Sequence, residues 1–588
     1  MDNTITRKAF YFDSKNSSIF CWLYRGKENP DSITIICPPI GHKYMAAHRS
    51  LRYFSDSLAC KNGLSIRLDY TNTGDSSDDK TESFSIKNAI DDIVTLVERL
   101  RQLHPTIPIN AIGFFMGASI LMLASQQVTF NDLVLWDPCI KGKRFIREIK
   151  VLSGILDKEN IEDQKVEATG VYLTAKFNVE LEKLDLIKPL DISCNRIMYL
   201  HKSEEKENNK LLNRLSNYSK FVDIEAYDGS DKMLTYPTDT AIPQKALDRI
   251  CQYLSEKKEA ADKNNLRKQM DALNSGLDKL CQNRILEGDG YAERCTAFGS
   301  GKSLFGIYSY ALKESNLGDL VVFLNCGSEH HVGPHRMYTN FSRALAKQGI
   351  SALRIDIEGI GDSISKGNNI ENKAYSPVVL SDIKTILEGA KEQGYRRFLL
   401  AGICAGAYHS FLSTSKLQTC NIVGAVMINP LIFARDYENE AAQSLSVRSQ
   451  GEISRYKSNF FSGEKWKKIF TGQIKLSYFI PIITNLISYK FKNMIKRLTS
   501  NKTNAVKESL LQIISLNRKI NILSARSDAG FEILKSEARN VVKRSLKEGN
   551  LEVDLLEIAD HGLSKQGMRD ELMVELIKKI EQQFFRTT

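Results

Sequence analysis

The chain has 588 residues, which exceeds one compact core and favours about two to four domains. Hydrophobic residues make up 42% and charged residues 26%, a composition that excludes a largely disordered chain. The net charge of +11 is mild for this length and no nucleic-acid-recognition motif accompanies it, so we expect no nucleic-acid partner, while an acidic partner stays open.

The eleven cysteines form no CxxC pair and no cluster with histidines at metal-ligand spacing. We therefore predict free thiols, no metal and no cofactor. The N-terminal segment MDNTITRKAF lacks the apolar core of a signal peptide, and no apolar run is long enough for a transmembrane helix. These features favour a cytoplasmic protein.

Two stretches of the chain match each other without a gap. Residues 38–76 align with residues 325–363 at an offset of 287, with 11 identities in 39 positions. The matched stretches end in a shared Gly-Asp-Ser triplet. The identical pairs include His48/His335, Arg49/Arg336, Phe54/Phe341, Arg67/Arg354 and Asp69/Asp356. A match of this length predicts an internal duplication, with an N-terminal copy over 1–256 and a C-terminal copy over 281–588.

The N-terminal copy alternates predicted strands and helices. An antiparallel pair over 8–26 precedes an apolar strand at 33–36, and a helix pattern covers about 85–103. A later Gly-x-x-x-Gly turn carries Phe115 at its centre, and a phenylalanine cannot act as a nucleophile. The last predicted strand, 221–227, is followed by Asp-Gly-Ser-Asp without a histidine. We therefore expect this copy to be catalytically degenerate.

The C-terminal copy repeats this order after a charged helical linker over 257–280. An antiparallel pair is predicted within 281–315, a strand at 320–324 and a helix over about 377–394. Strands that alternate with helices predict a mostly parallel sheet with helices on both faces. The fold class of both copies is therefore α/β.

The strongest chemical signal is Gly402-Ile403-Cys404-Ala405-Gly406, which follows an apolar run at 398–401. In a strand–turn–helix elbow, small flanking residues let strand and helix approach closely, and the strained turn exposes the central nucleophile. A thiol at a helix N-terminus beside a base attacks carbonyl carbons. Alone, the pattern fits a buried cysteine on a tight turn equally well.

An acid and a histidine follow in the order that such a nucleophile needs. Asp528 comes after a predicted strand at 520–523, and His561 comes after a strand at 551–558 and before a helix at about 566–583. His561 would accept the thiol proton and Asp528 would orient the imidazole. For the oxyanion hole we expect the amide of Ala405 and the loop at Gly327 and Ser328. Neighbouring Cys326 is interpreted as a small loop residue.

About 90 residues lie between Asn429 and Lys519, a point in the chain where this kind of fold often has an insertion. We predict a helical cap at about 430–518. Lysines, arginines and aromatic residues interleave there. This pattern fits three interpretations. The segment could be a solvated basic face, a docking surface for an acidic carrier protein or anionic head group, or a helix at a membrane surface.

With these residues in place, the C-terminal copy resembles α/β-hydrolases of the serine aminopeptidase and thioesterase type. More narrowly, this copy resembles predicted hydrolases found near exosortase, polysaccharide and polyketide or nonribosomal peptide genes. The segments that carry this resemblance are NCGSEHHVGPHRMY, RIDIEGIGDS, AGICAGAYHS and INPLIF. The N-terminal copy resembles a companion group through CPPIGHKYMAAHRSLR. The resemblance implies two tandem α/β-hydrolase domains with helical caps, acyl transfer and a role in natural product biosynthesis.

We therefore expect a Cys404–His561–Asp528 acyl enzyme that acts on an acyl thioester. An acyl or peptidyl carrier protein is one expected bearer of the acyl group, and either water or an amine or alcohol would accept it. An esterase or amidase is the alternative enzyme. A non-catalytic binding scaffold, with peripheral membrane contact left open, is the alternative from another class.

Overall fold

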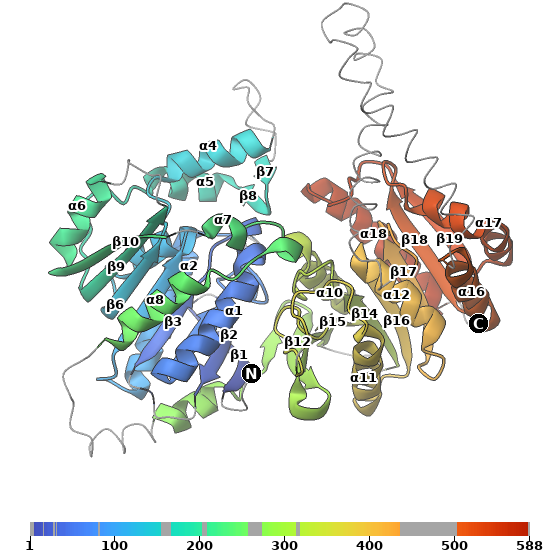
Figure 1. Ribbon diagram of the computed structural model, residues 1–588, viewed down its shortest axis with the longest axis horizontal. Helices are drawn as coiled ribbons and strands as arrows, with labels where there is room; N and C mark the ends of the chain where they lie inside the picture. The colour runs from blue at the N-terminus through green and yellow to red at the C-terminus, as the bar shows by residue number, and fades with distance from the viewer. Residues whose placement is uncertain are drawn as a thin grey trace, which may run out of the picture.

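The computed structural model describes residues 5–15, 17–26, 30, 32–79, 83–153, 166–202, 209–227, 229–256, 273–312, 318–367, 369–434 and 502–585. Figure 1 shows two α/β bodies side by side, the N-terminal copy in blue to green and the C-terminal copy in yellow to red. The expected α/β class is confirmed by two large, mostly parallel sheets flanked by helices.

The first sheet has eight strands, and the pairings β1 to β2 and β2 to β4 are antiparallel while the others are parallel. In spatial order the strands are β1 (Thr6–Asp13), β2 (Ser18–Arg25), β4 (Leu64–Leu68), β3 (Ile33–Cys37), β5 (Ile109–Phe114), β6 (Phe130–Trp136), β9 (Cys194–Lys202) and β10 (Phe221–Tyr227).

The second sheet repeats this order and adds one short strand at its edge. Its strands are β11 (Ile285–Glu287), β12 (Tyr291–Phe298), β13 (Leu304–Ala311), β15 (Ser351–Asp356), β14 (Asp319–Leu324), β16 (Arg397–Ile403), β17 (Ile422–Ile428), β18 (Lys519–Ala525) and β19 (Leu551–Leu556). The central strands read as nearly continuous apolar runs because helices cover both faces of the sheet.

Each sheet is enclosed by two helical layers. In the N-terminal copy, α1 (His42–Asn62) and α8 (Gln244–Ser255) pack on one face, and α2 (Ile86–Leu103) and α3 (Met116–Ala124) pack on the other. In the C-terminal copy, one layer consists of α10 (Met337–Lys347) and α18 (Gln566–Phe585). The other layer consists of α11 (Val379–Glu392), α12 (Ala405–Lys416), α16 (Lys502–Ser515) and α17 (Gly530–Glu548).

The N-terminal copy has further short elements. They are α4 (Gly142–Leu152), β7 (Val166–Ala168), β8 (Val171–Leu173), α5 (Ala175–Lys183), α6 (Asn209–Tyr218), α7 (Ser230–Met233) and the 3-10 turn η3 (Pro237–Asp239). Among them, α6 packs on the same sheet face as α2 and α3 through Leu211 and Leu215. The β7–β8 hairpin reaches the other copy, since Glu167 accepts hydrogen bonds from Arg569 and from the amide of Gln566. The C-terminal copy has two further 3-10 turns, η4 (Ser300–Lys302) and η5 (Pro334–Arg336).

The predicted linker and cap fall largely on residues 257–272 and 435–501, outside the described residues. Residues 273–280 are helical, and Leu273 and Leu277 are buried in the core of the N-terminal copy. At the other end of the predicted cap, α16 packs into the helical layer of the C-terminal copy through Val506 and Leu510. None of the helices in the described ranges is long and apolar enough to cross a membrane.

The two copies share an extensive interface built from equivalent residues. Arg67 donates to Asp362 at 2.6 Å, and its counterpart Arg354 donates to Asp75, the counterpart of Asp362. Each carboxylate therefore comes from the Gly-Asp-Ser loop of one copy and each guanidinium from a strand of the other. Aromatic rings extend this contact, because Phe305 lies 4.8 Å from Trp22 between ring centroids. The interface is as buried as a domain core.

Candidate active site

Cys404 lies at a sharp turn between β16 and α12. Its backbone has φ 53° and ψ −105°, a conformation that residues other than glycine rarely adopt. The flanking glycines make this turn feasible. A Cβ atom on Gly402 would lie 2.5 Å from the backbone of Gly406, and one on Gly406 would lie 2.4 Å from the Leu324 oxygen. Strand and helix are thus too close for any larger residue at either position.

Four neighbouring parallel strands, β16 to β19, carry the polar residues of the site in the loops after their carboxyl ends. Cys404 follows β16 and Asn429 follows β17. Asp528 follows β18, and His561 follows β19. Since parallel strands end at one edge of the sheet, residues far apart in the sequence meet there.

Asp528 and His561 form a direct pair. The Nδ1 atom of His561 lies 2.7 Å from Oδ2 of Asp528, and the carboxylate is 9% exposed while the imidazole is 41% exposed. Burial would lower the pKa of His561, but hydrogen bonds to Asp528 and Cys404 outweigh it and raise the pKa to about 10. These partners orient the imidazole toward the acid and the thiol, and they favour its protonated form.

Asn429 connects the acid strand to the histidine loop, and the sequence pattern did not single it out. Its side-chain oxygen accepts from the amide of Ala525 at 2.7 Å. Its side-chain nitrogen donates to the carbonyl oxygens of Asp560 at 3.3 Å and His561 at 3.0 Å. In the sequence, Asn429 could be recognised only by its position, as a polar residue directly after the apolar strand β17 and before the predicted cap.

The predicted oxyanion loop follows β14, the strand beside β16. Leu324 pairs with Gly402, so Cys326 and Cys404 stand at matching positions beyond the two strand ends. Gly327 has φ 61°, and the hydroxyl of buried Ser328 donates to the Asn372 oxygen at 3.0 Å. Ala405 opens α12, and the first N–H groups of a helix have no partner within that helix.

Cys326 and Glu329 sit in the same loop without the features of a nucleophile. Burial, Glu329 and Cys404 all raise the pKa of the Cys326 thiol well above its ordinary value. Burial also raises the pKa of Glu329 to about 8, and its Oε2 atom has no hydrogen-bond partner among the described residues. Both groups are therefore neutral near pH 7, and Cys404 is left as the thiol that the histidine faces.

The equivalent elbow in the N-terminal copy has the same backbone shape without the chemistry. Phe115 has φ 54° and ψ −116° between β5 and α3, and it is buried. The Lys43 ammonium lies 5.0 Å from the centre of its ring. After β10, the described chain continues at Gly229 and Ser230, and the sequence has no histidine there. The structure thus brings no nucleophile and base together at this elbow within the residues it describes.

One buried cluster has the composition of a metal site, namely His331, Asp356 and Asp362. Both ring nitrogens of His331 are already engaged, with Nδ1 2.7 Å from Asp356 and Nε2 2.7 Å from Asp75. Burial would lower the pKa of His331, but these two carboxylates raise it well above its ordinary value. An imidazolium that donates a hydrogen bond from each ring nitrogen has no lone pair left to bind a metal. The cluster is therefore a network of ion pairs at the interface.

Comparisons with known proteins give remote structural similarity. An esterase of Pyrococcus furiosus is 14% identical over 42% of this chain and 91% of its own, with a TM-score of 0.31. Est1E of Butyrivibrio proteoclasticus is 18% identical over 42% of this chain and 97% of its own, with a TM-score of 0.33. An acylaminoacyl peptidase of Pyrococcus horikoshii is 13% identical over 45% of this chain and 44% of its own, with a TM-score of 0.30.

No protein-family model and no curated protein matches the chain. Structural likenesses at these identities and scores assign no activity to it.

Proposed function

We propose that the C-terminal copy is an acyl-transferring enzyme in which Cys404 is the nucleophile, His561 the general acid and base, and Asp528 the orienting acid. The observation that carries the proposal is the strained elbow at Cys404 together with an imidazole that is hydrogen-bonded to a carboxylate only 9% exposed to solvent. Structural cysteines do not require this combination of turn, base and acid.

The proposed first half-reaction forms a thioester on Cys404. The thiol proton passes to His561 as the sulfur attacks the carbonyl carbon of the substrate, whose oxygen becomes an oxyanion. The amides of Ala405, Gly327 and Ser328 are the proposed donors to that oxyanion, where one donor contributes about 2.7–4 kcal/mol. The intermediate then collapses, and the leaving thiol or alcohol takes the proton from His561.

The second half-reaction releases the acyl group. His561 accepts a proton from water, an amine or an alcohol as that group attacks the Cys404 thioester, and then returns the proton to the departing sulfur. An acyl thioester on a carrier protein is the proposed substrate, because exchange between two thioesters is nearly thermoneutral. Hydrolysis of simple esters or amides is the second candidate, and it uses the same residues.

Intact-protein mass spectrometry tests this proposal. We expect incubation with short- and medium-chain acyl thioesters and activated esters to add one acyl group to the wild-type protein, and we expect Cys404→Ala to abolish the adduct. His561→Ala should slow acylation by about 10²-fold or more, the typical contribution of a general base. Wild-type protein that neither forms an adduct nor turns over any ester or thioester would favour the scaffold role instead.

A further inference from the structure

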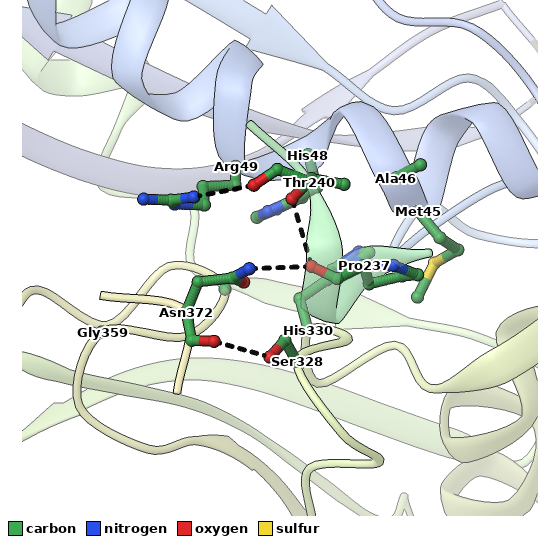
Figure 2. A pocket seen from close by; sticks show the side chains of 11 residues that line it. Met45, Ala46, His48, Arg49, Pro237, Thr240, Ser328, His330, Gly359 and Asn372 are labelled. Carbon is green, nitrogen blue, oxygen red and sulfur yellow. Dashed lines mark hydrogen bonds between the residues drawn. The ribbon is translucent and has the colours of Figure 1, made fainter. Parts of the chain in front are cut away.

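The loop with Gly327 and Ser328 is fastened to the N-terminal copy through one residue, Asn372. The Ser328 hydroxyl donates to the backbone oxygen of Asn372 at 3.0 Å. The side-chain nitrogen of Asn372 donates to the backbone oxygens of Pro237 at 2.8 Å and Thr238 at 3.3 Å. Figure 2 shows this chain of hydrogen bonds crossing a small cavity between the two copies.

The backbone of Asn372 is shaped for this role. Its φ of 64° is left-handed, a region that asparagine tolerates better than most residues, and its amide donates to the Gly359 oxygen at 3.0 Å. The preceding residue is also fixed from the N-terminal copy, because Glu371 pairs with Arg52 at 3.0 Å and with Arg49 at 3.7 Å. Two successive residues of the C-terminal copy therefore take their positions from α1 and η3 of the other copy.

The η3 turn is itself well fixed. The Thr240 hydroxyl donates to the Pro237 oxygen at 3.1 Å, and Arg49 donates to the Thr240 oxygen at 3.2 Å. Its Thr238 methyl group also lies against the oxyanion loop directly, since a Cβ atom on Gly327 would be 3.6 Å from it. A rigid turn thus supports the loop by contact at Gly327 and by hydrogen bonds through Asn372.

We propose that the N-terminal copy is a positioning domain, whose Pro237–Asp239 turn holds the oxyanion loop of the C-terminal copy through Asn372. The inference rests on the proposed function, since an oxyanion loop matters only if Cys404 is acylated. It gives the degenerate copy a role in the reaction although Phe115 cannot act as a nucleophile. Asn372 touches no reacting atom and is a positioning residue.

The test compares two reactions of the same sulfur. Acylation of Cys404 by a p-nitrophenyl ester or an acyl thioester builds an oxyanion, whereas alkylation by iodoacetamide displaces iodide at a saturated carbon and builds none. Asn372→Gly keeps the left-handed backbone and the oxygen that accepts from Ser328, but removes both donations to the N-terminal copy. We expect the variant to be acylated about 10-fold more slowly than wild type. This is less than the 10²–10³-fold loss of rate that removal of an oxyanion-hole donor causes, because the donors are displaced and not removed. We expect the alkylation rate to stay within about 2-fold of wild type.

Asn517→Gly is the matched control, because Asn517 is also left-handed, with φ 51°, and it precedes β18, so it lies at the sheet edge opposite the one where Cys404, Asp528 and His561 meet. It should change neither rate. Ser328→Ala breaks the other end of the connection and should give the same split, so a poorly folded Asn372 variant does not block the test.

Equal acylation rates in wild-type protein and folded Asn372→Gly would overturn the inference. A parallel fall of acylation and alkylation would also overturn it, since the variant would then disturb the nucleophile. If wild-type protein alkylates at Cys404 but never acylates, the proposed function fails, and the positioning role fails with it.

Discussion

At the scale of single residues, Cys404 and Phe115 show that the elbow conformation is imposed by packing. Their φ values are 53° and 54°, although one residue carries a thiol and the other a phenyl ring. In both copies the glycines around the turn have backbone atoms within 2.5 Å of where a Cβ would stand. The strain is therefore a property of the strand–helix junction, and chemistry depends on which side chain occupies it.

His561 gives a pH-dependent prediction at this scale. Its pKa is raised from 6.5 to about 10 by its partners, Asp528 and Cys404, against the opposing effect of burial. Below pH 6.5 both folded and unfolded chains are protonated there, and the stabilisation is complete. Between pH 6.5 and about 10 the folded chain alone keeps the proton, so this stabilisation falls as pH rises and is absent above pH 10.

We therefore expect the difference in unfolding free energy between wild type and His561→Gln to shrink steadily from about pH 6 to about pH 10. The slope cannot exceed about 1.4 kcal/mol per pH unit, because a single proton distinguishes the two states. Since the imidazole is 41% exposed, screening by solvent narrows the pH range over which this slope applies. Urea unfolding at several pH values measures it. A difference that is constant across this range would show that His561 is not paired as described.

At the scale of elements, the contact between α12 and the end of β14 joins the proposed nucleophile to the proposed oxyanion loop. Gly406 is the second residue of α12, and a Cβ there would lie 2.4 Å from the Leu324 oxygen and 3.0 Å from the Asn325 oxygen. We expect Gly406→Ala to lower the unfolding free energy by about 1–3 kcal/mol, the usual cost of overpacking. Thermal and urea unfolding provide the measurement.

Gly567 offers a matched control, because it is also the second residue of its helix, α18, and the nearest atom to an added Cβ is 3.9 Å away. Gly567→Ala should be neutral or stabilise by up to about 1 kcal/mol, since alanine loses less backbone freedom than glycine in a helix. Equal effects of the two substitutions would mean that the close approach at Gly406 is absent.

Several helices and strands could be predicted from the sequence, because the patterns that specify them are local. The strands before Asp528 and His561, the helix at about 85–103 and the antiparallel pair within 281–315 are all present, since apolar runs and turn residues specify them. The β7–β8 hairpin, β11, Asn429 and Asn372 were not predicted. The two asparagines act on residues more than a hundred positions away, and no periodicity in one sequence encodes such a contact.

At the scale of the whole molecule, equivalent residues of the two copies exchange ion pairs. Burial would raise the pKa of Asp362, but Arg67 and His48 lower it well below its ordinary value. The side chains of Arg67 and Asp362 are 7% and 3% exposed, so neither charge has water as a substitute partner. Since this pair and Arg354–Asp75 both lie between the copies, we expect the two sheets to unfold together rather than one after the other.

Arg67→Met tests this coupling, because it removes the guanidinium while retaining an unbranched apolar side chain. Removing one partner of a buried ion pair costs about 3–5 kcal/mol. We expect a loss toward the lower end of that range in a single urea transition, since His48 stays 3.3 Å from Asp362. Lys8→Met is the control, since Lys8 and Asp278 are 31% and 45% exposed and such pairs contribute at most about 1 kcal/mol. Two resolved transitions, with only one moved by Arg67→Met, would mean that each copy folds independently of the other.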